Sequence, residues 1–134
     1  MRHKSETVLA YVTLFLAVLH FFLEGYAHWK WGQPLQALLV DYIWIALAIF
    51  GGATSLKVRP LSAAGLLAAS WGFAVGFAWR SAFGRLALSE AERAAGNGEP
   101  MAVTYVVVSA LCLAFAMLLW SLFLAFKQSK AGGV

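Results

Sequence analysis

Four long apolar runs, separated by shorter polar or mixed segments, dominate the pattern of the chain. They cover about residues 7–27, 35–56, 61–79 and 101–126. Each run is close to the roughly 20 apolar residues that an α-helix needs to cross the hydrocarbon core of a bilayer. The pattern therefore predicts an all-α integral membrane protein, a four-helix bundle that occupies residues 1–134 as a single domain.

The connections between the runs predict how the helices follow one another. The first two connections are short, so the first three helices should be antiparallel neighbours in an up-and-down bundle. The third connection, residues 80–100, is the only sizeable extramembrane segment, and we expect it on the outer surface. Within it, SEAE at 89–92 is a capping-box pattern and Gly-Asn-Gly at 96–98 is a helix stop, which together predict a short helix.

The composition points to the same environment. Apolar and aromatic residues make up 62% of the chain and charged residues only 12%, whereas soluble domains carry about 25% charged residues. The formal net charge of +4 does not indicate nucleic acid, because the basic residues stand at the ends of apolar runs. The single cysteine, Cys112, excludes an internal disulfide and a CxxC metal or redox motif.

The distribution of Lys and Arg predicts the orientation of the bundle. Six of these residues lie on the side of the N-terminus, the second connection and the C-terminus, and four lie on the other side. The six are Arg2, Lys4, Lys57, Arg59, Lys127 and Lys130. Because cytoplasmic loops carry the excess of Lys and Arg, we expect a multi-pass protein of the cell membrane with both termini in the cytoplasm.

The first run resembles the apolar part of a secretory signal peptide, because a basic and polar start precedes it. It is too long for a typical h-region, however, and no clear A-x-A cleavage pattern closes it. We therefore expect this run to be retained as the first transmembrane helix.

The third run is rich in small residues, and its Gly72 and Gly76 form a GxxxG pair. Small residues let helices approach closely in lipid, where no hydrophobic force holds helices together. Three interpretations are open. The helix packs tightly inside the bundle, it contacts a second copy or a membrane partner through Gly72 and Gly76, or it forms a cavity wall where side chains are missing.

Four titratable side chains lie within or beside the predicted helices, toward the outer side. His20, Glu24 and His28 follow one another at four-residue intervals and so form a slowly drifting stripe on the first helix. Asp41 lies in the second helix near the depth of Glu24. Charged groups in a bilayer cost about 2.5–3.5 kcal/mol each and are therefore candidates for function. We expect these residues to gather in the outer half of the bundle, and the inner half to be almost purely apolar.

Three roles fit this group of residues. The first is metal binding, but the rise of a helix puts His20 and His28 about 12 Å apart, so only one adjacent pair plus Asp41 can share an ion. The second is a proton relay or an acid–base pair acting on a lipophilic molecule. The third is structural pairing across helices. No phosphate loop, nucleophile elbow or haem-attachment motif is present, and we assign neither a metal nor a cofactor.

A short motif carries a resemblance to a known family. Residues 20–25 read HFFLEG, which resembles the His-x-x-x-Glu-Gly stretch on an early helix of the emopamil-binding, sterol isomerase-like proteins of the EXPERA superfamily. The resemblance implies a four-helix core whose cavity holds a sterol while protonation and deprotonation move a double bond. His20 and Glu24 match the motif, and Asp41 would stand where the family has another acidic residue on the following helix.

The resemblance also suggests which residues contact a ligand. Carboxylates and aromatic faces would stabilise a carbocation intermediate, and Trp44 and Trp71 are candidates for those faces. Tyr105 begins the fourth helix on the same side and is a further candidate.

We therefore expect a small membrane protein whose polar site handles a lipophilic ligand. Glu24 and Asp41 would act as proton donors or acceptors, with His20 as their orienting partner. The alternative is a non-catalytic accessory or structural subunit that binds a membrane partner, or a second copy, through the small-residue face of the third helix. The bilayer is the expected environment, and no nucleic acid is expected.

Overall fold

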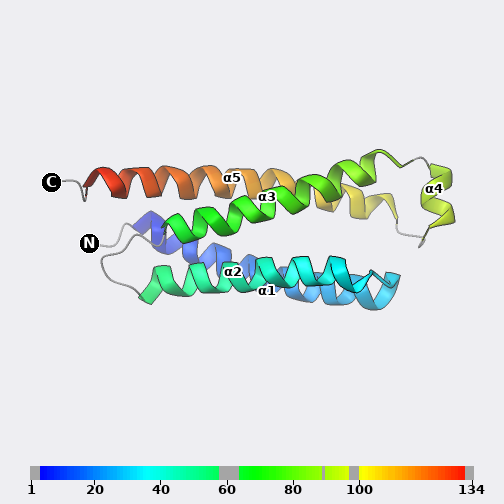
Figure 1. The fold of residues 1–134 in the computed structure, drawn as a ribbon, viewed down its shortest axis with the longest axis horizontal. Coiled ribbons are helices and arrows are strands. Elements are labelled where there is room, and N and C mark those ends of the chain that lie inside the picture. The colour runs from blue at the N-terminus through cyan, green and yellow to red at the C-terminus, as the bar shows by residue number, and fades with distance from the viewer. Residues whose placement is uncertain (1–3, 58–63, 89, 97–99, 132–134) are drawn as a thin grey trace.

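The computed structural model describes residues 4–57, 64–88, 90–96 and 100–131, and these form helices joined by short turns. The helices are α1 (Lys4–Trp31), α2 (Leu35–Lys57), α3 (Ala64–Leu86), α4 (Glu90–Ala95) and α5 (Met101–Ala131). The prediction of an all-helical protein is confirmed. In Figure 1 the four long helices lie along one axis, the start of α1 and the end of α5 are at one end, and α4 is at the other.

Three helices of the described segments are long and apolar enough to cross a membrane: α1, α2 and α5. The expectation of a membrane protein is therefore supported by these three helices. The fourth long helix, α3, has 23 residues, as many as α2. It does not meet the same criterion of apolarity, because its glycines, serines, tryptophans and two arginines lower its mean hydropathy.

The helix boundaries follow local signals in the sequence. α1 ends before Gly32, whose φ of 65° lies in the left-handed region, and the Gly32 N–H donates to the His28 carbonyl at 3.0 Å. Pro34 and Pro100 immediately precede α2 and α5, where a proline needs no hydrogen bond of its own.

Several helices extend beyond their predicted boundaries. α1 and α5 extend beyond 7–27 and 101–126, and α3 continues to Leu86, so part of the expected 80–100 loop is helix. The short helix predicted in that loop is present as α4. Residues 61–63 at the predicted start of the third helix, Ser89 of the capping box, and Arg2 and Arg59 of the basic flank lie outside the described residues.

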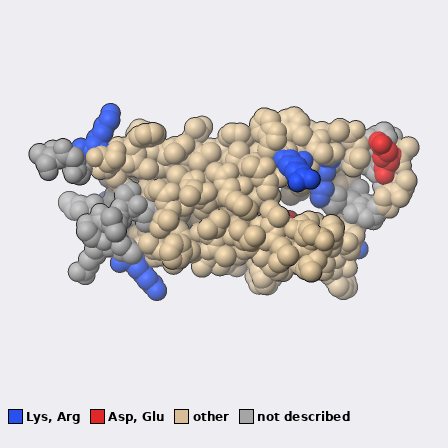
Figure 2. Space-filling view, viewed as in Figure 1, with Lys and Arg blue, Asp and Glu red and all other residues tan. Residues whose placement is uncertain are grey.

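The hydrophobic core is divided along the length of the bundle. The main cluster of buried residues draws on all four long helices, for example Leu9, Trp44, Trp71 and Met117. A second cluster, Ala78, Ala82 and Leu111, involves α3 and α5 only. The pair α3–α5 is thus packed together at the α4 end without α1 and α2. Figure 2 shows the surface hollowed there, between the pair α1–α2 and the pair α3–α5.

Among the glycines that the structure describes, the one with the closest neighbours is Gly52 of α2, and not a glycine of α3. A Cβ atom on Gly52 would lie 2.8 Å from the Cγ atom of Leu14 and 3.3 Å from the Ala10 carbonyl oxygen. A Cβ on Gly72 would lie 3.9 Å from Leu118, an ordinary contact, and one on Gly76 would meet nothing within 4 Å. The α3 residues that are buried are mostly alanines. α3 therefore packs through alanine, and Gly76 is open.

A ladder of polar contacts runs along α1, so the prediction of an almost purely apolar inner half is wrong. Glu6, Thr13 and His20 follow at seven-residue intervals and share one face of the helix. Glu6 is buried and accepts a hydrogen bond from the Ser55 hydroxyl at 2.8 Å and another from Gln128. Thr13 Oγ1 accepts from the indole N–H of Trp71 at 3.0 Å. Glu6 was overlooked because the predicted helix began one residue after it.

Candidate functional site

The candidate site begins with two residues on one face of α1. His20 and Glu24 are four positions apart, which places their side chains one turn apart on the same face. The Nε2 atom of His20 lies 3.9 Å from Oε1 of Glu24. Both side chains are mostly shielded, with 24% and 20% of their surface exposed.

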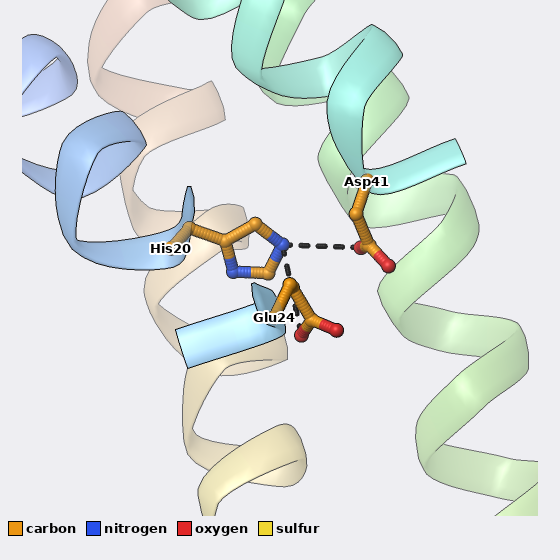
Figure 3. A network of polar contacts seen from close by, with 3 residues as sticks. All are labelled: His20, Glu24 and Asp41. Atoms are coloured by element: carbon orange, nitrogen blue, oxygen red, sulfur yellow. Dashed lines mark hydrogen bonds and ion pairs between the residues drawn. The ribbon is translucent and has the colours of Figure 1, made fainter. Parts of the chain in front are cut away.

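α2 completes the site with Asp41. The Nε2–H group of His20 donates a hydrogen bond to Oδ1 of Asp41 at 3.0 Å, and Asp41 is buried. In Figure 3 the imidazole points away from α1 toward both carboxylates. Its Nε2 atom therefore contacts Asp41 and lies close to Glu24 at the same time. The three residues predicted to share a site are thus brought together, from two helices.

Aromatic rings lie against the polar cluster. Trp44, on α2, meets the His20 ring edge to face, with 5.0 Å between ring centroids. Phe77, on α3, lies 6.3 Å from the His20 ring and 6.4 Å from Trp44. Trp44 is only 4% exposed, yet its indole N–H has no hydrogen-bond acceptor among the residues that the structure describes. A buried N–H group without a partner costs about 1–3 kcal/mol, so it indicates a position where an acceptor could be bound.

Two further residues of the site were not predicted from the sequence. The Gln33 side chain hydrogen-bonds Glu24, and the positive charge of Arg85 acts on the same carboxylate. Gln33 lies in the turn between α1 and α2, and Arg85 in the last turn of α3. The sequence analysis placed Arg85 in a loop, since it ended the third helix at residue 79. The sequence did hold one signal for Gln33: it is a polar residue in the short connection that follows the helix of Glu24.

Three other predicted residues lie apart from the cluster. Trp71 is buried and 5.5 Å from Trp44 by ring centroid, but its N–H is already bonded to Thr13. Tyr105 is 63% exposed on α5. His28 is half-buried near the end of α1 and does not belong to the group formed by His20, Glu24 and Asp41.

Charged side chains are also visible around the hollow between the two helix pairs. In Figure 2 basic side chains lie on the rim of the hollow and acidic atoms are visible at its edge. Arg85 comes from α3, whereas Glu24 and Asp41 come from α1 and α2, so the positive charge and the two acids belong to different helices. The site thus combines two carboxylates and one imidazole with the neighbouring aromatic rings of Trp44 and Phe77. It can transfer protons or hold a cation.

The comparisons with known proteins add no family to this description. No family model, no curated protein and no solved structure matches the chain. The resemblance of residues 20–25 to the EXPERA proteins therefore stays a prediction from a short motif. The function has to be argued from the residues of the site.

Proposed function

We propose that this protein binds a lipophilic molecule from the bilayer and transfers protons to and from it at His20, Glu24 and Asp41. The observation that carries the proposal is the position of His20 Nε2, 3.0 Å from one carboxylate and 3.9 Å from another, between two apolar helices. Two acids that share one imidazole can hold and exchange a proton. A purely structural tie would need only one of them.

The reaction that suits this site is the migration of a carbon–carbon double bond. One carboxylic acid gives its proton to one carbon of the double bond, which leaves a carbocation. The other carboxylate then removes a proton from the carbon on the far side of the cationic centre, so the double bond re-forms one position away and no atom is gained or lost. Glu24 and Asp41 are the donor and acceptor, and His20 orients both.

The surroundings of the site support a substrate class. The rings of Trp44 and Phe77 lie beside His20 and would stabilise a developing positive charge. The unpartnered Trp44 N–H would donate to an oxygen of the substrate. A largely apolar molecule with one hydroxyl or carbonyl group, such as a sterol, fits these contacts. The EXPERA resemblance of HFFLEG agrees with this class.

Solvent-deuterium incorporation tests the proposal. The purified protein is incubated in D₂O with lipids extracted from the source membrane, and the lipids are analysed by mass spectrometry. We expect one lipophile to change its double-bond position and gain one deuterium. Glu24→Gln and Asp41→Asn should each lower this conversion by at least about 10²-fold, because general acid–base catalysis typically contributes that much.

The matched control is Tyr105→Phe, which removes a polar group from an exposed position outside the cluster. It should leave the conversion unchanged. Helix content and the elution volume in detergent should be the same for all variants. Conversion that continues at the wild-type rate in Glu24→Gln and Asp41→Asn would refute the assignment of these acids.

The proposal includes an orientation in the membrane. All four long helices would span, α3 included, in an antiparallel path with both termini in the cytoplasm of a cell-membrane protein. The positions of the helix ends and of α4 in Figure 1 support this path. Lys4, Lys57, Lys127 and Lys130 lie at the α1-start end, as the positive-inside rule requires of a cytoplasmic side.

One observation favours a second candidate, an accessory subunit without catalytic function. Gly76 is exposed on α3, and a Cβ there would meet no atom of the described residues within 4 Å. Gly65, Ala69 and Gly84 are exposed on the same helix. A partner helix could approach closely along this face. Retention of a membrane protein on the wild-type chain but not on Gly76→Leu would support this role.

A further inference from the structure

We infer that His20, Glu24 and Asp41 also form a binding site for one divalent first-row metal ion, such as Zn²⁺, Fe²⁺ or Co²⁺. Each residue offers one ligand atom, and the three atoms all lie within 4.8 Å of one another. The inference goes beyond the proposed function, because the ion can bind whether or not a lipophile does. A bound ion would occupy the same atoms that transfer protons and would therefore compete with that chemistry.

The distances are close to those of a coordination sphere. Bonds from such ions to His nitrogen and carboxylate oxygen are about 2.0–2.2 Å long, so two ligands of one ion lie at most about 4.2 Å apart. The His20 Nε2 atom is 3.0 Å from Asp41 Oδ1 and 3.9 Å from Glu24 Oε1, both within that limit. The three ligand atoms lie within 4.8 Å of one another, so a shift of a few tenths of an ångström would bring all of them within that limit.

The donor set indicates the class of ion. One imidazole nitrogen and two carboxylate oxygens suit Zn²⁺, Fe²⁺ and their neighbours, whereas Mg²⁺ and Ca²⁺ prefer oxygen alone and Cu⁺ prefers sulfur. Two carboxylates bring two negative charges into an apolar surrounding, which attracts a dication. The positive charge of Arg85 acts on Glu24 and would oppose the ion. The net charge of these groups still favours a cation.

A second feature near the cluster fits a bound ion. The Oε1 atom of Gln33 is buried, and within residues 4–57, 64–88, 90–96 and 100–131 no donor reaches it. Gln33 also hydrogen-bonds Glu24, so this oxygen lies beside the ligand set. It could accept a hydrogen bond from a water molecule on the ion. Three protein ligands leave such a coordination position open, as in catalytic zinc sites.

Metal titration of the purified protein tests the inference. The protein is freed of metal with a chelator in detergent and titrated with Zn²⁺ by calorimetry, and with Co²⁺ by its visible absorption. We expect one ion per chain and a Co²⁺ spectrum typical of mixed nitrogen and oxygen ligands. Because the ion needs an imidazole nitrogen and carboxylates that carry no proton at the ligand atoms, binding should strengthen as the pH rises.

Ligand variants distinguish this site from adventitious binding. His20→Ala, Glu24→Gln and Asp41→Asn should each weaken Zn²⁺ binding at least about tenfold, whereas His28→Ala, on the same helix but outside the cluster, should not. A wild-type protein that binds no Zn²⁺ below millimolar concentration would overturn the inference. Equal binding by wild type and His20→Ala would also overturn it. None of these readouts depends on the lipophile, so the inference and the proposed function can fail separately.

Discussion

At the scale of single residues, the buried carboxylate of Glu6 is held by hydrogen bonds from two other helices. Ser55 reaches it from α2 and Gln128 from α5. An acidic side chain taken out of water is costly unless each oxygen finds a donor. Both oxygens of Glu6 have one, so this residue fixes the end of the bundle where α1 starts.

Ser55→Ala should lower the free energy of unfolding by about 1–2 kcal/mol, because one oxygen of Glu6 then loses its donor while still buried. Equilibrium unfolding in mixed micelles, followed by circular dichroism, measures this change. Ser129→Ala is the control, since Ser129 is exposed and bonds only to the Phe126 carbonyl of its own helix. Equal stability of the two variants would contradict the role given to Ser55.

The sequence was sufficient to predict the centre of the candidate site. His20, Glu24 and Asp41 are ionisable groups in apolar runs, and the period of a helix together with the short turn at 32–34 fixed their depth. Gln33 and Arg85 could not be predicted in the same way. Their contacts with Glu24 depend on how far α3 continues and on side-chain reach between helices. No periodicity in the sequence encodes either quantity.

At the scale of helices, α1 and α2 are joined by a close contact at Gly52, where a Cβ atom would lie 2.8 Å from Leu14 Cγ. In the sequence, Gly72 and Gly76 form a GxxxG pair, which is compatible with close packing inside the bundle, with a partner contact or with a cavity wall. That motif shows where helices can approach but not which face meets a neighbour. The existence of the helices was predictable from their apolar runs, whereas the contact face depended on packing.

Gly52→Ala should destabilise the protein by about 1–3 kcal/mol, because Leu14 and the α1 backbone would have to move apart from α2. Gly76→Ala is the matched control. It has open space for the added methyl group and should leave stability unchanged or raise it slightly, since alanine favours a helix. Unfolding in mixed micelles compares the two, and a larger loss for Gly76→Ala would contradict the assigned contact.

At the scale of the whole molecule, two helix pairs share a core at one end and part at the other. The main core cluster includes residues of all four long helices, and the second cluster only those of α3 and α5. The hollow in Figure 2 lies where they part. The sequence could not predict this division, because all four runs are apolar along their length. The division depends on which side chains of neighbouring helices pack against one another.

The proposed orientation predicts which end can be labelled from outside. Single cysteines are introduced as Ala91→Cys in α4 and Ser129→Cys in α5, both exposed, on a Cys112→Ser background. An impermeant thiol reagent added to right-side-out vesicles should label Ala91→Cys at once. Ser129→Cys should react only after the vesicles are opened. The reverse pattern would show that the bundle is inserted the other way.

The ladder along α1 has a consequence for synthesis. Glu6, Thr13 and His20 are bonded to helices that emerge from the ribosome later. The last of these helices is α5, whose Gln128 bonds Glu6. When α1 first reaches the translocon, these groups have no partners. α2 then supplies Ser55 and Asp41, so we expect α1 and α2 to enter the bilayer together as a hairpin. The nascent chain would remain dependent on the insertion machinery until α5 arrives.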